Sequence, residues 1–175
     1  MKTLGYVLSD FPVLSETFVG TEIRAMEALG YQVKPFAFNI HQDGGQPIDK
    51  PLIDKAVALS SVNNLSALTV WLRNPLRSVK ALSFILRQNG LPKKSLIRSA
   101  GQLARIALAH GCDHLHAHFA LHTAATAIAA SKLSGCHVSF VGHGYDVYAR
   151  PADLALSLNL QTFLCAFVKI CATDF

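Results

Sequence analysis

The amino-acid sequence predicts an α/β fold, with a doubly wound and mainly parallel sheet. Three observations predict it. Short runs of apolar and β-branched residues, typical of strands buried on both faces, recur along the chain. Longer segments with apolar residues at helical spacing alternate with them. The chain is 51% hydrophobic and only 15% charged, so its 175 residues can bury a substantial core as one domain.

The first 38 residues are expected to form a β-α-β unit. Residues 3–9 and 33–38 are the apolar runs that predict its two strands, which should be parallel with a right-handed crossover. Between them lies a helix that we expect Gly30 to end. Ser15 or Thr17 is expected to cap the start of this helix, because small hydroxyl side chains accept hydrogen bonds from the first free amides.

The middle of the chain is predicted to be largely helical. Residues 39–51 are polar and rich in Gly and Asp, which favours a surface loop, and residues 53–59 favour a short strand. Two or three helices are then predicted, over residues 65–73, from the Asn74 cap and Pro75 onward, and over residues 93–110.

The last third returns to alternating strands and helices. A strand over residues 114–119 leads into an Ala-rich helix that Gly135 should end. Three more elements are predicted, a buried strand over residues 138–141, a helix over 154–164 and a strand over 167–172. The sequence stops after that strand, where a doubly wound fold normally continues, so we expect it to be part of a longer protein.

The composition excludes several classes of protein. The hydrophobic fraction argues against disorder, and no run reaches the 18 apolar residues of a membrane-spanning helix. Asp10 and Pro12 cut the first apolar run too short for a signal peptide. The four cysteines are widely spaced without a C-x-x-C motif, which favours free thiols in a reducing cytoplasm.

Basic residues are concentrated in one part of the chain. Residues 55–112 contain nine Lys or Arg and no acid, whereas the remainder contains seven basic and eleven acidic residues. Helical spacing predicts that Leu72, Leu76, Val79, Leu82 and Leu86 lie on one side of these helices, and that a basic face lies opposite. This basic face is either an ordinary solvated surface or a binding surface for an anionic partner. Of the possible partners, a membrane surface fits better than nucleic acid, because few aromatic side chains that could stack on bases lie among the basic residues. The basic face consists of Arg73, Arg77, Lys80 and Arg87.

A Gly-His-Gly sequence follows the strand predicted over residues 138–141. Gly142 and Gly144 allow a sharp turn and a close approach to a ligand, and they hold His143 between them. Ligands of parallel sheets bind beyond the carboxyl ends of strands, so His143 is a candidate functional residue. The alternative is a plain turn with an exposed histidine. A dinucleotide-binding fingerprint is disfavoured, because Val147 stands where its third glycine belongs.

Three alternating histidines, His114, His116 and His118, point to one face of the strand predicted over residues 114–119. Such a cluster can hold a metal in a hydrolase, which would also need carboxylates from other strand ends. The alternative is a set of polar side chains beside a cleft.

Three motifs, in matching order and spacing, resemble bacterial exopolysaccharide glycosyltransferases of the GT-B fold. The family meant is the retaining, metal-independent group-1 (family 4) type, as in colanic-acid-like biosynthesis. The resemblance extends over essentially the whole chain. The motifs are Phe-Pro-Val-Leu-Ser-Glu-Thr-Phe-Val at residues 11–19, His-Leu-His-Ala-His-Phe-Ala at 114–120 and Phe-Val-Gly-His-Gly-Tyr-Asp at 140–146.

The resemblance implies that residues 1–175 are the Rossmann-like, acceptor-side N-terminal half of a GT-B fold. The C-terminal donor-binding half would be absent, since Glu16, Glu22 and Glu27 do not reproduce the family's pair of glutamates eight residues apart. His143 would reach across the cleft between the halves to the donor sugar and stabilise the transition state. The chain alone would be inactive.

The same match implies the other site residues and partners. Ser15, Glu16 and Thr17 would border the cleft, although the Gly-Gly pair of many relatives is missing there. The partners would be a nucleotide-sugar donor, a saccharide or lipid-linked acceptor, the missing C-terminal domain and an anionic membrane surface, with no nucleic acid, metal or cofactor. The protein would be cytoplasmic, peripheral on the inner face of the plasma membrane. Further substrate-binding candidates are His118, Gly142, Gly144, Tyr145 and Asp146.

Three functions thus remain open from the sequence: half of a sugar-nucleotide transferase, a non-catalytic binding module of the same fold, and a metal hydrolase that uses His114, His116 and His118.

Overall fold

The computed structural model describes residues 2–143, 146, 153, 157 and 163–164. Within this part of the chain, six strands form one sheet in the order β3-β2-β1-β4-β5-β6, and every neighbouring pair is parallel. The predicted doubly wound α/β fold is therefore confirmed. The strands are β1 (Thr3–Phe11), β2 (Gln32–Ile40), β3 (Val57–Ala58), β4 (His114–His118), β5 (His137–Val141) and β6 (Phe163–Leu164).

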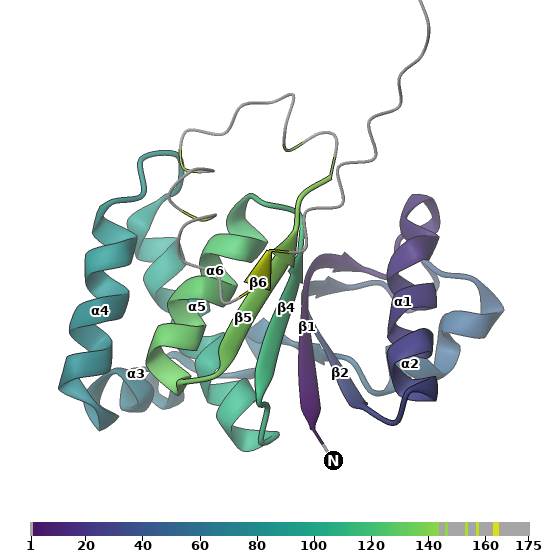
Figure 1. Cartoon of the computed structure of the whole chain (residues 1–175), viewed down its shortest axis with the longest axis horizontal. Helices are drawn as coiled ribbons and strands as arrows, with labels where there is room; N and C mark the ends of the chain where they lie inside the picture. The colour runs from purple at the N-terminus through teal and green to yellow at the C-terminus, as the bar shows by residue number, and fades with distance from the viewer. Residues whose placement is uncertain (1, 144–145, 147–152, 154–156, 158–162, 165–175) are drawn as a thin grey trace, which may run out of the picture.

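Helices cover both faces of the sheet. α1 (Thr17–Ala28) and α2 (Lys50–Asp54) lie on one side, and the other four helices lie on the opposite side (Figure 1). Short 3-10 helices over Leu14–Glu16, Pro47–Asp49 and Leu59–Ser61 connect the elements. No helix in the described residues is long and apolar enough to cross a membrane. The four helices on the second side are α3 (Asn64–Arg73), α4 (Pro75–Leu86), α5 (Lys93–Ala109) and α6 (His122–Ser134).

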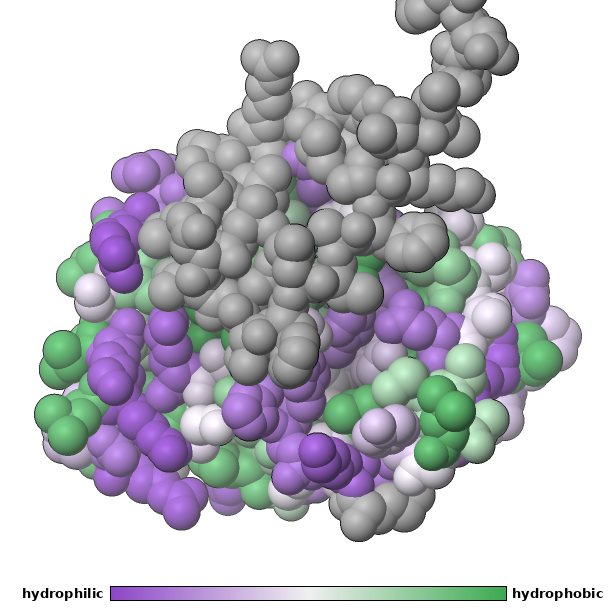
Figure 2. Space-filling model, viewed as in Figure 1, coloured by the Kyte–Doolittle hydropathy of each residue, from purple (hydrophilic) through white to green (hydrophobic). Residues whose placement is uncertain are grey.

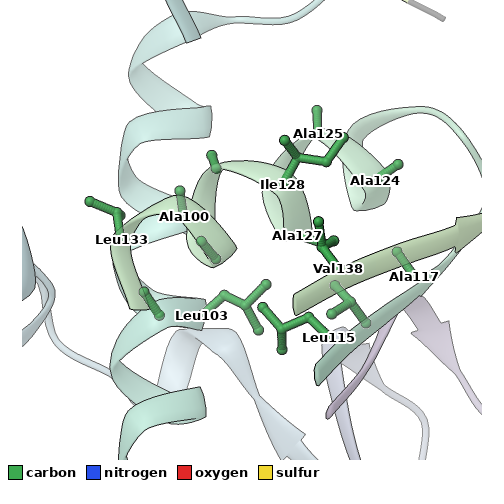
Figure 3. Close-up of a cluster of buried hydrophobic side chains, with 14 of the residues drawn as sticks. Ala100, Leu103, Leu115, Ala117, Ala124, Ala125, Ala127, Ile128, Leu133 and Val138 are labelled. Carbon is green, nitrogen blue, oxygen red and sulfur yellow. The ribbon is translucent and has the colours of Figure 1, made fainter. Parts of the chain in front are cut away.

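Successive side chains of β1 point to opposite faces of the sheet, and each face has its own hydrophobic core. Tyr6 and Leu8 face α1 and α2, whereas Val7 faces the larger core under α3 to α6. In that larger core α6 is buried on nearly every side, because it packs between the sheet and the outer helices. Alanines let α5, α6 and the strands approach closely around Leu103, Leu115 and Ile128 (Figure 3).

Several predicted local signals are confirmed. The side chain of Asn74 accepts a hydrogen bond of 3.1 Å from the amide of Arg77, and Pro75 opens α4. Gly135 follows the end of α6 with a φ of 89°, in the left-handed region that glycine adopts without strain. The free thiols of Cys112 and Cys136 also agree with the prediction.

Other boundaries were predicted wrongly. Neither Ser15 nor Thr17 caps α1, because the 3-10 helix of Leu14–Glu16 runs directly into it and makes Glu16 the N-cap residue. Residues 50–54 are helical rather than loop and strand, since Pro51 starts α2 and turns Leu52 and Ile53 into the core.

The end of the chain is only partly described. Phe163 and Leu164 pair with β5 as strand β6, so the predicted helix over residues 154–164 is wrong at these two positions. Most of the remaining helix and the strand predicted over 167–172 lie outside the described residues.

Gly5→Ala is expected to lower the free energy of unfolding by about 1–3 kcal/mol, the usual cost of overpacking a core. A Cβ at Gly5 would lie 2.5 Å from Cε2 of Phe36 and 2.9 Å from Cδ2 of Leu115. Both side chains are fully buried, so neither can move aside freely. Urea unfolding followed by circular dichroism measures the change. Gly30→Ala is the comparison, because an added Cβ there meets no atom within 4 Å and only its φ of 88° opposes it. Equal stability of Gly5→Ala and the wild type would contradict this packing.

Candidate functional site

A cleft opens at the carboxyl ends of β1 and β4, where the sheet order changes direction. Its volume is about 350 Å³. Among the residues that the structure describes, three carboxylic acids, from Asp10, Glu16 and Asp146, contribute to its wall, and no lysine or arginine does. The other lining residues are Ser9, Val13, Phe119, Leu121, His122 and Thr123.

His143 lies beside this cleft, two residues after the end of β5. Its ring centroid is 4.4 Å from that of Phe119 and 4.8 Å from that of Phe18, so two aromatic rings from different elements flank the imidazole. It also stacks on His118 with 5.6 Å between centroids, and its Nε2 lies 3.4 Å from Nδ1 of His118. The predicted pair His118 and His143 is therefore brought together.

Asp146 holds the turn that carries His143. Its Oδ2 accepts a hydrogen bond of 2.8 Å from the amide of His143, and its own amide donates to the carbonyl of His143 at 2.9 Å. The residue is completely buried, and its Oδ1 has no hydrogen-bond partner among the described residues. Asp146 thus orients His143, as well as lining the cleft. Gly142 is half-buried, whereas Gly144 and Tyr145 lie outside the described residues.

His143 is a neutral imidazole at neutral pH. Burial lowers its pKa, and the carboxylates of Asp146 and Glu22 only partly oppose this effect. A neutral imidazole donates through one nitrogen and accepts through the other, so it can exchange hydrogen bonds with a hydroxyl group of a ligand.

The backbone at the end of β4 is strained. Phe119 has a φ of 69°, a left-handed conformation that is unusual for a bulky residue. The hydroxyl of Thr123 lies 2.6 Å from the carbonyl oxygen of His118 and 2.9 Å from that of Phe119, and the amide of Phe119 donates to Val141. These contacts hold the Phe119 ring over His143.

The loop of residues 15–17 contributes less than predicted. Glu16 lines the cleft, but Ser15 and Thr17 are exposed and take no part in its wall. Burial, and then the nearby carboxylate of Asp10, raise the pKa of Glu16. The hydrogen bond from His41 lowers the pKa of Asp10, and this pair is 2.9 Å apart. Two acids side by side make this loop unsuited to a phosphate group.

The three histidines of β4 face α1, but they do not form one cluster. His116 and His118 converge on Glu22 of α1, at 3.4 and 3.6 Å, and these three are the residues that offer ligand atoms close together. Nε2 of His114 instead lies 2.6 Å from the hydroxyl of Ser139. The structure therefore does not support a hydrolase in which all three histidines bind one metal ion. Burial lowers the pKa of His114 and His116 to about 4 and that of His118 to about 3.

Sequence reasoning missed Glu22. The sequence offered only a weak sign that Glu22 is functional. It is an acid next to Ile23, which lies on the buried face of α1. Its partners on β4 lie more than 90 residues away in the chain, so only the folded structure shows that they meet.

The predicted division of α4 into an apolar and a basic side is wrong. The buried face of α4 consists of Ser78, Ala81, Phe84 and Ile85. Small residues at two of these positions let the helix approach α6, with which α4 packs. The apolar residues predicted to lie opposite the basic face are mostly exposed beside it, and Leu82 alone of them is half-buried. The exposed fractions are 71% for Leu72, 77% for Leu76, 64% for Val79 and 61% for Leu86.

The basic face is therefore interleaved with exposed apolar side chains. Arg73, Lys80 and Arg87 are exposed, and Leu65 and Leu68 of α3 extend the same surface. Hydrophilic and hydrophobic residues alternate over α4 in the space-filling view (Figure 2). Arg77 differs from the others, because its Nη1 donates a 2.6 Å hydrogen bond to the carbonyl of Ser134 at the end of α6. We name Leu72, Arg73, Leu76, Val79, Lys80, Leu86 and Arg87 the α3–α4 surface.

Comparison of the chain with protein-family models and with curated proteins gives no match. The proposed function therefore rests on the fold, on the cleft beside His143 and on the α3–α4 surface.

Proposed function

We propose that this chain is the acceptor-side domain of a retaining glycosyltransferase, which transfers a sugar from a nucleotide-sugar to a saccharide or lipid-linked acceptor. The observation that carries the proposal is the position of His143. A neutral imidazole stands between aromatic rings beside a cleft at the carboxyl ends of parallel strands, where ligands of this fold class bind.

The chemistry of the cleft favours an uncharged, hydroxyl-rich ligand. Carboxylates are strong acceptors for hydroxyl donors, and Asp10 and Glu16 supply them, while Asp146 is buried behind the wall. The same negative charges repel phosphates, and none of the described lining residues is a lysine or arginine that would offset the repulsion. A saccharide acceptor fits this wall better than a nucleotide diphosphate does, so the donor phosphates are assigned to the proposed second domain.

His143 has a suitable arrangement to assist transfer. When Nδ1 of His118 donates to Nε2 of His143, the proton of His143 resides on Nδ1. That nitrogen can then donate to an oxygen of the transferred sugar as charge develops in the transition state. Asp146 fixes the backbone of His143, so the imidazole is positioned before the substrate arrives. No metal or cofactor is assigned a role in this step.

The α3–α4 surface is proposed to bring the domain to an anionic membrane, where a lipid-linked acceptor is available. Exposed leucines insert among lipid headgroups while arginine and lysine contact anionic lipids, which is the behaviour of interfacial helices. The domain is accordingly proposed to be cytoplasmic and peripheral on the inner face of the plasma membrane.

Ligand preference of the cleft is tested by titration of the isotope-labelled chain followed by NMR. Neutral disaccharides are expected to shift the amide signals of Phe119, His122 and Thr123, whereas UDP-glucose and GDP-mannose are expected to leave them unchanged. Asp10→Asn with Glu16→Gln should weaken the saccharide response about tenfold, since each lost charged acceptor contributes about 1.5–3 kcal/mol when fully desolvated and less in an open cleft.

Asp54→Asn is the matched control, because this exposed acid is remote from the cleft wall. Micromolar binding of a nucleotide-sugar to the chain would contradict the acceptor-side assignment. Saccharide binding without turnover in the protein that carries both domains would favour the non-catalytic binding module instead.

A further inference from the structure

Three polar side chains converge where α1 packs against β4. Nε2 of His116 lies 3.4 Å from Oε1 of Glu22, and Nε2 of His118 lies 3.6 Å from Oε2. One ligand atom from each residue lies within 4.8 Å of the other two. Tetrahedral Zn²⁺ with bonds of about 2.0–2.2 Å holds its ligand atoms about 3.3–3.6 Å apart. The two nitrogen–oxygen distances are of this length, one to each oxygen of the Glu22 carboxylate, so an ion bound to one of these oxygens needs only a small adjustment of the side chain.

The two imidazole nitrogens are orphaned in the described part of the protein. Nε2 of His116 and Nε2 of His118 are both buried and lack a hydrogen-bond partner there. The side chain of His118 is only 1% exposed, so bulk water does not replace that partner. A buried polar atom without a partner is unfavourable, and a cation between the three residues would satisfy both nitrogens at once.

We propose that Glu22, His116 and His118 form a binding site for a divalent transition-metal ion. Two imidazoles and one carboxylate are a ligand set that favours Zn²⁺, whereas Mg²⁺ and Ca²⁺ favour sites built from oxygen alone. The proposal concerns metal binding and does not depend on the glycosyltransferase assignment.

Neighbouring groups orient the three ligands. The hydroxyl of Tyr6 donates a 2.8 Å hydrogen bond to Oε1 of Glu22. The hydroxyl of Ser139 lies 2.7 Å from Nδ1 of His116 and 2.6 Å from Nε2 of His114. Since a hydroxyl carries one proton, Ser139 can accept from His116 and donate to His114. In that arrangement the free electron pair of His116 is on Nε2, which faces Glu22, and such outer partners are typical of metal-binding histidines.

The site has room for a fourth ligand. A cavity of about 480 Å³ adjoins it, with Tyr6, Glu22, His116 and Ser139 in its wall. Three protein ligands with an open position would leave the ion accessible to water or to a small ligand. A metal on Nε2 of His118 would also place the proton of that ring on Nδ1, 3.4 Å from Nε2 of His143. Metal binding would thereby couple to the orientation of His143.

The test is calorimetric titration of the purified, chelator-treated chain with ZnCl₂, together with the visible absorption of its Co²⁺ form. We expect one ion per chain at micromolar affinity or tighter, and the intense d–d bands of a four-coordinate Co²⁺ site. Glu22→Gln removes a ligand and should weaken binding by at least about 100-fold, and Tyr6→Phe by about 10-fold, as for loss of an outer partner.

The matched control is His137→Asn, which removes an exposed histidine at the start of the neighbouring strand β5, outside the ligand set. It should bind Zn²⁺ as the wild type does. The Glu22 side chain is 38% exposed, so Glu22→Gln should fold, which circular dichroism checks. His116→Gln is a second ligand variant if it does not. Failure of the wild type to bind one ion, or wild-type affinity in the folded ligand variants, would overturn the proposal. Equal loss in His137→Asn would overturn the assignment of the ion to these three ligands.

Discussion

His143→Ala is expected to lower turnover on the order of 100-fold in the protein that joins this domain to a donor-binding domain, the usual effect of removing a preorganised donor to developing charge. Stability should fall by only about 1 kcal/mol, because the ring is half-buried and packs mainly against Phe18 and Phe119. Release of nucleoside diphosphate in the presence of acceptor measures the rate. The reduction should appear in kcat more than in KM, since the contact strengthens in the transition state.

His137→Ala is the matched control, because this exposed histidine lies at the opposite end of the same strand, β5. It should retain wild-type turnover. A His143→Ala protein with wild-type kcat would remove His143 from the mechanism, and the cleft would then remain only a binding site. Turnover of Asp146→Asn should lie between those of His143→Ala and the wild type, since an amide side chain no longer holds the His143 amide through a charged acceptor.

Loss of the three exposed cations Arg73, Lys80 and Arg87 of the α3–α4 surface is expected to weaken binding to anionic vesicles on the order of 100-fold. Arg73, Lys80 and Arg87 should each contribute about 1 kcal/mol next to anionic lipid, and about 3 kcal/mol corresponds to two decades in affinity. Replacement of all three by Gln, followed by co-sedimentation with phosphatidylserine-containing vesicles, measures the change. Binding of the wild type should fall steeply with added salt, because the Debye length is about 8 Å at physiological ionic strength.

Two controls separate membrane contact from charge and folding. Gln at Lys93, Lys94 and Arg98 of α5 changes the net charge equally on another exposed surface and should retain binding. Leu72→Ser with Leu76→Ser should weaken binding although no charge changes, because both leucines are exposed and available for insertion. Equal recovery on neutral and anionic vesicles would show that the α3–α4 surface is an ordinary solvated face.

Arg77 is excluded from the triple variant for a structural reason. Its guanidinium donates to the carbonyl of Ser134 at the end of α6 and lies against Gly135, so it closes a helix terminus. The sequence placed it with Arg73, Lys80 and Arg87 by spacing alone. Replacement of Arg77 should therefore lower the stability of the fold. Weaker vesicle binding by an Arg77 variant would then reflect this loss of stability as well as any loss of membrane contact.

The local elements could be predicted from the sequence because their signals are local. Asn74 with Pro75 starts a helix, Gly135 ends one, and the apolar run before Gly142 is a buried strand. These signals depend on the conformational preferences of a few consecutive residues. The alternation of such elements was sufficient to predict the doubly wound fold, and it placed His143 at the carboxyl end of a strand.

The orientation of α4 could not be predicted in this way. The helix carries two apolar stripes, one with Leu76 and Val79 and the other with Phe84 and Ile85, so helical periodicity allows either to be buried. Close packing against α6 selects the stripe that contains Ser78 and Ala81, because only small residues permit that approach. The basic residues were thus found from the sequence, whereas the exposed leucines beside them were not.

What the sequence determined by itself was the alternation of strands and helices, the parallel sheet and the position of His143 after a buried strand. Only the tertiary structure decided that Glu22 meets His116 and His118, and that acids from different elements share the cleft. The physical reason is that these contacts join residues from different elements. Their distances depend on how two faces of the sheet are packed, which no local preference of the chain encodes.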